Sequence, residues 1–128
     1  MEPYSSDDIR RKRRKKHLEK LIGAIPEGTF ALIVSAEGLP IASTLPQGFN
    51  ETKIAARTAT LFSLSKKAIM EMRKGDLDQL YITGSEGYLL IMQAGPNAVL
   101  IMSATKDIKL ELILLDCRRI CEKIAKLI

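Results

Sequence analysis

The sequence predicts one α+β domain, a three-layer α/β/α sandwich in which three helices cover both faces of a five-stranded antiparallel sheet. Along the 128 residues, hydrophobic spacing changes between helical and strand periods in the order α-β-β-α-β-β-β-α. Short glycine-containing turns join successive strands, as in antiparallel hairpins. The last two strands are nearly all apolar, which implies that helices cover the sheet on both faces.

The first helix is predicted from a cap signal and an apolar stripe. Ser5-Ser6-Asp7-Asp8 offers an N-cap and two acids for the first turn. Pro26-Glu27-Gly28 is expected to end the helix. The stripe at helical spacing consists of Leu18, Leu21, Ile22 and Ile25.

A hairpin follows, with strands predicted at Thr29–Ser35 and Leu39–Leu45 and a turn at Ala36-Glu37-Gly38. Because Pro40 has no backbone N–H to donate, the second strand is expected at an edge of the sheet.

A long middle helix is predicted between a cap at Asn50 and an end near Gly75. With about 100° between successive residues, a broad arc centred near Ile54 is expected to face the sheet. The residues of that arc are Ala55, Thr58, Leu61, Phe62, Leu64, Ser65, Ala68, Ile69 and Met72. The opposite side carries small or flexible residues flanked by lysines, namely Ala56, Ala59, Ser63 and Met70. Two interpretations stay open here: residues tolerated on a helix surface, or a face that lets another helix approach closely.

The last three strands are predicted at Gln79–Thr83, Tyr88–Gln93 and Asn97–Ala104. If Leu80, Tyr81 and Ile82 close the sheet, their exposed edge would accept a partner strand. Asp107 is expected to cap a final helix. Its apolar stripe consists of Leu110, Ile113, Leu114, Cys117, Ile120, Cys121, Ile124 and Leu127.

The net charge of +5 is concentrated at the N-terminus. Residues 1–20 hold eight basic and four acidic side chains, whereas the remaining 108 residues hold twelve and eleven. The excess comes from seven consecutive cations: Arg10, Arg11, Lys12, Arg13, Arg14, Lys15 and Lys16. This run is either a solvated extension or a tether to an acidic surface such as nucleic acid, anionic lipid or an acidic protein. No aromatic residue interrupts it, so the run does not suggest base stacking.

Residue patterns typical of catalysis, cofactor binding or metal binding are not found. The sequence has no G-x-x-x-x-G-K-[ST] phosphate loop and no G-x-G-x-x-G turn. The single histidine, His17, stands beside the basic run, and Cys117 and Cys121 fit small core residues. Asp76 and Asp78 are read as solvated acids. The longest apolar runs are too short for a membrane helix, so the expected location is the cytoplasm. From the missing motifs we expect no cofactor, no metal and no catalytic residue.

The hairpin resembles a known family. It reads ALIVSAEGLPIAST (Ala31–Thr44) and follows LEKLIGAIPEG (Leu18–Gly28). Its turn, built on Glu37, Gly38, Leu39 and Pro40, resembles the acidic-Gly-Leu-Pro-Ile-Ala-Ser turn of the roadblock/dynein light chain family. The element order and the glycine turn before the YLLIM strand also match. The resemblance covers about residues 17–128 and leaves residues 1–16 as a separate basic arm; it departs at 108–111, where many members carry a glycine.

This resemblance implies a profilin- or longin-like sandwich that homodimerises by pairing its middle helices and joining its third strands into one ten-stranded sheet. Members of the family bind Ras-like small GTPases, serve as motor light chains or act as subunits of scaffolds. Some bacterial relatives stimulate a partner's GTP hydrolysis without a catalytic residue of their own. We therefore expect a non-catalytic homodimer that binds and regulates or scaffolds a Ras-like small GTPase. The paired middle helices are expected to form the dimer contact and the partner-facing platform around Ala56, Ala59, Ser63 and Met70. The alternatives are a dimeric tether acting through the basic arm and a structural light chain.

Overall fold

The computed structural model describes residues 6–25 and 29–128 and contains the eight predicted elements in the predicted order. They are α1 (Ser6–Gly23), β1 (Thr29–Ser35), β2 (Pro40–Ser43), α2 (Glu51–Glu71), β3 (Leu80–Gly84), β4 (Gly87–Gln93), β5 (Ala98–Thr105) and α3 (Leu110–Leu127). In the predicted cap signal Ser5-Ser6-Asp7-Asp8, Ser5 lies outside the described residues, and Asp7 and Asp8 lie in the first turn of α1 as predicted. The predicted helix end at Pro26-Glu27-Gly28 also lies outside the described residues.

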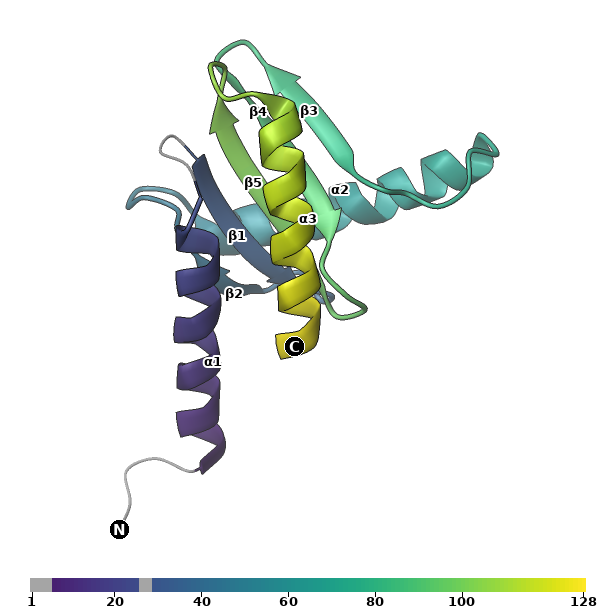
Figure 1. Ribbon diagram of the computed structural model, residues 1–128. Helices are drawn as coiled ribbons and strands as arrows, with labels where there is room; N and C mark the ends of the chain where they lie inside the picture. Colours follow the sequence, from purple (N-terminus) through teal and green to yellow (C-terminus); the bar gives the residue numbers. More distant parts are fainter. Residues whose placement is uncertain (1–5, 26–28) are drawn as a thin grey trace.

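The five strands form one antiparallel sheet in the order β2-β1-β5-β4-β3. β2 is an edge strand, as Pro40 predicted, and β3 is the edge on the other side. Helices α1 and α3 lie on one face of the sheet and α2 lies on the other (Figure 1). The predicted three-layer α+β sandwich is therefore confirmed.

Alternation along the central strands divides the core into two halves. On β5, Leu100 and Met102 face α1 and α3, whereas Ile101 faces α2. The α1/α3 half also buries Cys117 and Cys121 as small core residues, as predicted. The half under α2 is smaller, because only Ala55, Thr58 and Phe62 of that helix are buried.

Asn50 caps α2 as predicted: its backbone is extended and its Oδ1 accepts a hydrogen bond from the Lys53 N–H at 3.0 Å. The other end differs from the prediction. The helix stops at Glu71 because Arg73, and not a glycine, takes the left-handed conformation with φ 57°. The Arg73 N–H then donates to the Met70 carbonyl and the Lys74 N–H to the Ile69 carbonyl, which satisfies the last turn.

The predicted cap of the last helix is wrong. Asp107 accepts a hydrogen bond from the Thr105 hydroxyl within the loop, which also holds the pKa of this carboxyl below its usual range. α3 begins three residues later at Leu110, and the residue in the cap position, Lys109, makes no side-chain cap bond. The predicted stripe of α3 is confirmed, with five of its members buried: Ile113, Cys117, Ile120, Cys121 and Ile124.

Candidate functional site

The surface of α2 exposes large apolar side chains that the sequence pattern placed against the sheet. Leu64 is 57% exposed and Met72 is 72% exposed, and Leu61 and Ala68 are also exposed. The prediction that these four residues face the sheet is wrong. The physical reason is the position of α2, which lies over β1 and β2 while its second half runs beyond the sheet (Figure 1).

These four residues, which we call the leucine stripe, lie on one side of α2. Ile54 begins the same side, because Leu61 follows it after about two turns. Ile54 lines an apolar cavity of about 170 Å³ together with Phe30 of β1, Leu89 of β4 and Ile101 of β5. The leucine stripe therefore continues along the side of α2 that is directed toward β4.

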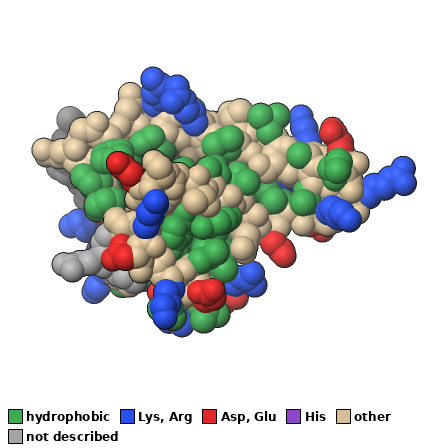
Figure 2. Space-filling view, turned by 90° about the horizontal axis from the view of Figure 1, so that it is seen from above, with side chains coloured by type: hydrophobic (Ala, Val, Ile, Leu, Met, Phe, Trp, Pro, Cys, Tyr) green, Lys and Arg blue, Asp and Glu red, His purple; other side chains and the backbone are tan. Residues whose placement is uncertain are grey.

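The half of this sheet face beyond α2 is also apolar. Leu80 and Ile82 of β3 and Leu89 of β4 are half-buried and pack against the core cluster beneath α2. Figure 2 shows hydrophobic side chains over the centre of one face of the molecule, with both basic and acidic side chains among and around them. The leucine stripe and the part of the sheet at β3 and β4 thus both present apolar side chains on the α2 face of the sheet.

β3 leaves one edge unpaired within the chain. It hydrogen-bonds to β4 from Leu80–Ile91 to Gly84–Gly87 and has no strand on its other side among the described residues. Tyr81 lies on the opposite face, with its ring centroid 5.5 Å from that of Tyr88. The predicted candidates Leu80, Tyr81 and Ile82 all lie on this edge strand.

The small-residue line on α2 has two roles in the structure. Ala56, Ser63 and Met70 are exposed, whereas Ala59 is half-buried against the turn between β1 and β2. Gly38 in that turn has φ +87°, and a Cβ on it would lie 3.4 Å from the Ala59 Cβ. Part of the small-residue pattern is therefore explained by packing within the chain.

The turn at Glu37–Pro40 holds an apolar side chain beside α2. The Ser35 Oγ accepts a hydrogen bond from the Leu39 N–H at 3.1 Å, and the Gly38 N–H donates to the Ser35 carbonyl at 3.0 Å. Leu39 itself is 58% exposed. These bonds fix the turn, so that Leu39 extends the outer surface of α2 without a large loss of entropy on binding.

α2 and the segment after it are positively charged. Residues 51–74 hold six Lys or Arg and two Glu, and all eight side chains are exposed. Lys67 lies on the outer side of the helix, whereas Arg57, four residues before Leu61, lies on the side of the leucine stripe. Lys66 lies with its Nζ 5.2 Å from the centroid of the Phe62 ring and lines a cavity of about 210 Å³ with Ser63 and Pro96. The surface formed by Leu39, Ala56, Ser63, Lys66 and Lys67 is called the outer platform below.

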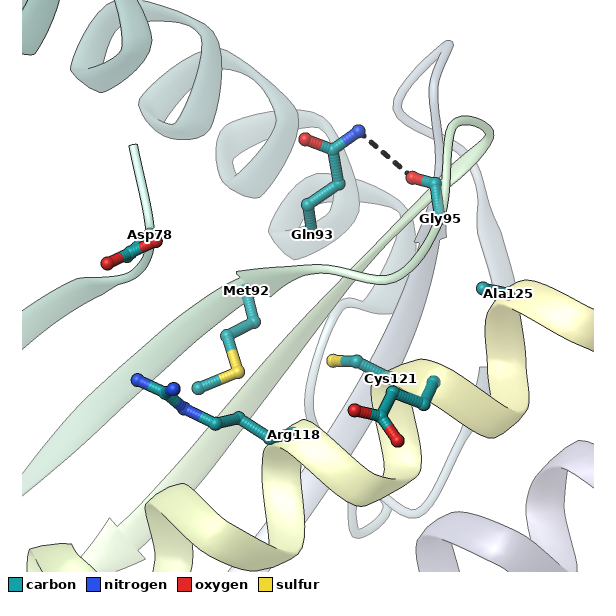
Figure 3. Close-up of a pocket in the computed structure, with 8 residues that line it drawn as sticks. Asp78, Met92, Gln93, Gly95, Arg118, Cys121 and Ala125 are labelled. Atoms are coloured by element: carbon teal, nitrogen blue, oxygen red, sulfur yellow. Dashed lines mark hydrogen bonds between the residues drawn. The ribbon is translucent and has the colours of Figure 1, made fainter. Parts of the chain in front are cut away.

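A second groove, on the other face of the sheet, lies between α3, the segment just before β3, and the end of β4 with the β4–β5 turn (Figure 3). It has a volume of about 370 Å³. The Arg118 Nη2 donates to the Gln79 Oε1 at 3.2 Å, and the Gln93 Nε2 donates to the Gly95 carbonyl at 3.0 Å. Cys121 is the one thiol lining the groove, and burial raises its pKa to about 12. A protonated thiol is a poor nucleophile, so Cys121 is not activated for attack near neutral pH.

The cysteine pair leads to a testable pH dependence. Burial raises the pKa of both the Cys117 and Cys121 thiols from 9.0 to about 12. The unfolded chain ionises first as the pH rises, so this stabilisation is complete below pH 9 and is lost between about pH 9 and pH 12. We expect urea unfolding to show a loss of up to about 1.4 kcal/mol per thiol and pH unit there. The Cys117→Ala/Cys121→Ala variant should have a flatter pH profile. An equally steep profile in this variant would contradict the assignment.

Within residues 6–25 and 29–128, no group of three His, Cys, Asp or Glu side chains is arranged to hold a metal ion. None of the three helices there is long and apolar enough to cross a membrane.

The sequence is similar to a known protein family and to known archaeal proteins. The sequence profile of the Roadblock/LC7 domain matches residues 16–104. The uncharacterized protein MJ1340 of Methanocaldococcus jannaschii is 30% identical over 94 residues, which cover 73% of this chain and 82% of that protein. The uncharacterized protein MJ0310 of the same organism is 29% identical over 94 residues, with the same coverage.

Three solved structures show the same fold at low sequence identity. MglB of Myxococcus xanthus has a TM-score of 0.77 at 16% identity, covering 89% of this chain and 93% of that chain. A Roadblock/LC7 domain of Streptomyces avermitilis has a TM-score of 0.76 at 20% identity, covering 86% and 93%. The gliding protein MglB of Thermus thermophilus has a TM-score of 0.70 at 18% identity, covering 99% and 97%.

Proposed function

The chain belongs to the Roadblock/LC7 domain family, and on this premise we propose that it is a non-catalytic homodimer that binds and regulates a Ras-like small GTPase. The observation that carries the proposal is the apolar surface between the leucine stripe and the open edge of β3. An apolar patch next to an unpaired strand is costly for an isolated chain, and association would cover both features at once.

The dimer that fits this surface is symmetric. Two copies related by a two-fold axis would pair their β3 strands antiparallel and place their α2 helices side by side. The leucine stripe of each chain would then cover the half of the partner's sheet face that the partner's α2 leaves open. The fold is compatible with assembly, since a solved MglB has a tetrameric arrangement.

This arrangement changes the assignment of the predicted interface residues. Leu80, Tyr81 and Ile82 stay in the proposed dimer contact, and Leu61, Leu64 and Met72 join them. Ala56, Ser63 and Met70 point away from the leucine stripe and belong to the partner-facing side of α2. Ala59 has a packing role against Gly38.

The outer platform is the proposed contact for the GTPase. Small side chains at Ala56 and Ser63 allow the backbone of another protein to approach closely, and Leu39 supplies a fixed apolar contact. Lys66 and Lys67 favour an acidic partner surface and raise the rate of encounter. Such a module regulates its partner only if it binds the GTP and GDP states with different affinities, because equal affinity would shift no equilibrium.

The test is a titration of the chain against each Ras-like GTPase of the source organism, loaded with GTP or GDP. We expect one GTPase to bind with at least a tenfold difference between nucleotide states. Lys66→Glu/Lys67→Glu should weaken this binding roughly tenfold, because two favourable charge contacts become repulsive.

The matched control is Lys123→Glu/Lys126→Glu, which makes the same charge change on α3, on the opposite face of the sheet. It should leave binding within about twofold of the wild type. Failure of every GTPase to bind in either state would refute the proposed function. Equal losses in the two variants would refute the outer platform as the contact.

A further inference from the structure

The basic arm is part of a rigid helix. α1 is continuous from Ser6 to Gly23, so the boundary between residues 16 and 17 falls inside one helix. Leu18 and Ile22 are fully buried in the core beside α3 and fix the second half of the helix. The first half, residues 6–17, is exposed along its whole length and projects away from the sheet past the end of α3 (Figure 1).

The cations surround this projecting helix. Successive residues point about 100° apart, so the seven residues from Arg10 to Lys16 occupy the full circumference over about two turns. Arg10, Arg13 and Arg14 lie on one side, and Arg11, Lys15 and Lys16 lie toward the other. No apolar side is formed in the run, in contrast to the amphipathic helices that lie in a membrane surface.

From this geometry we propose that the projecting half of α1 binds the major groove of double-stranded DNA through its phosphates, without reading the base sequence. A flat anionic surface can contact only one side of a straight helix and leaves the opposite cations unused. A groove has phosphates along both walls, so it engages cations on both sides. All-round charge therefore favours a groove over a bilayer.

The dimensions favour B-form DNA among nucleic acids. An α-helix with side chains is about 10–12 Å across, and the major groove of B-DNA is about 12 Å wide. The major groove of A-form RNA is too deep and narrow for such an element. Single strands are bound mainly by stacking on aromatic residues, and the run from Arg10 to Lys16 contains none.

The arm would act independently of the proposed GTPase contact. α1 lies on the face of the sheet opposite α2, and residues 21–128 are nearly neutral, with twelve basic and eleven acidic side chains. The DNA proposal does not rest on the GTPase proposal, and either can fail alone.

The test uses the full chain and a fluorescein-labelled 20-base-pair duplex of arbitrary sequence, with binding followed by anisotropy between 50 and 200 mM NaCl. If one arm engages seven phosphates, the plot of log K against log salt should have a slope of about −6. Affinity should then fall about a thousandfold or more across this range. A second duplex of unrelated sequence should bind equally well.

Two matched variants test engagement of both sides of the helix. Arg10→Gln/Arg13→Gln/Arg14→Gln removes cations from one side, and Arg11→Gln/Lys15→Gln/Lys16→Gln removes three from the other. Glutamine keeps the helix propensity, and the buried anchors Leu18 and Ile22 are untouched. Each variant should reduce the steepness of the salt dependence by about 3 in the slope. The two variants should weaken DNA binding by factors similar to each other. The control Lys53→Gln/Arg57→Gln/Lys74→Gln removes the same charge from α2 and the segment after it, outside the outer platform, and should bind DNA like the wild type.

Several results would overturn the proposal. A loss confined to one of the two arm variants would indicate contact with a flat surface. A loss in the α2 control equal to that in the arm variants would indicate general charge attraction. Cosedimentation with vesicles of 30% phosphatidylglycerol at a salt concentration that abolishes DNA binding would identify the arm as a membrane tether instead. No binding to the duplex at 50 mM NaCl would also refute it.

Discussion

Leu64→Arg is expected to convert the proposed dimer into a monomer. Leu64 lies in the centre of the leucine stripe and is 57% exposed in the single chain, so an arginine is readily accommodated there before association. In the dimer the guanidinium would be buried in an apolar contact without a partner. We expect a cost of at least about 3 kcal/mol, which raises the dissociation constant more than a hundredfold. Light scattering should show the mass falling from twice 14.2 kDa to 14.2 kDa.

The matched control for this experiment is Leu112→Arg. Leu112 is 60% exposed on α3, on the opposite face of the sheet, and its substitution should leave the dimer intact. Ala59→Arg is a less informative variant, because Ala59 packs against Gly38 and a large side chain would disturb the fold of each chain. A wild-type protein that is monomeric at micromolar concentration would refute the dimer. A dimeric Leu64→Arg protein would refute the proposed contact.

Leu100→Ala is expected to destabilise the fold by about 3 kcal/mol. Leu100 lies on the central strand β5 and is 1% exposed within the core half that α1 and α3 cover. Removing three carbons there leaves a cavity that the strands cannot close without breaking their ladder. We expect the melting temperature to fall by roughly 10 °C in thermal unfolding followed by circular dichroism at fixed protein concentration.

Leu115→Ala makes the same chemical change on the surface. Leu115 is 63% exposed on α3, so its truncation should change stability by less than about 0.5 kcal/mol. A similar loss for both variants would indicate that α3 buries Leu115 in an assembly. No loss for Leu100→Ala would contradict the core described above.

The fold could be predicted from the sequence because local signals and burial agree over most of the chain. Asn50 caps its helix through a hydrogen bond to a residue three positions away, which a local pattern can detect. Pro40 placed its strand at an edge because a missing donor excludes a central position. The loop at Asp107 differed, since the Thr105 hydroxyl competes for the carboxylate that would cap the helix.

The candidate site could be predicted only in part. The apolar spacing indicates that Leu61, Leu64 and Met72 are buried in a contact. It does not show whether that contact is with the same chain or with another chain. The structure shows that α2 extends past the sheet, which depends on the path of the whole chain and not on α2 alone. The role of Ala59 could not be predicted for a similar reason: it lies beside Gly38 of the β1–β2 turn, and the spacing along the helix does not indicate which turn packs against it. The left-handed conformation of Arg73, which ends α2, could not be predicted from the sequence, because non-glycine residues rarely take that conformation.

The continuous α1 helix has a mechanical consequence. A disordered basic tail would let a bound ligand move freely around the domain. A helix anchored at Leu18 and Ile22 instead fixes the position and orientation of the ligand relative to the rest of the domain. At about 1.5 Å per residue, the twelve exposed residues from Ser6 to His17 extend about 18 Å from the anchored end of the helix, and the seven cations lie along this length. A ligand bound to these cations is therefore held in a fixed orientation to the α1/α3 layer. Because α1 and α2 lie on opposite faces of the sheet, the domain can bind one ligand at each helix without either one blocking the other.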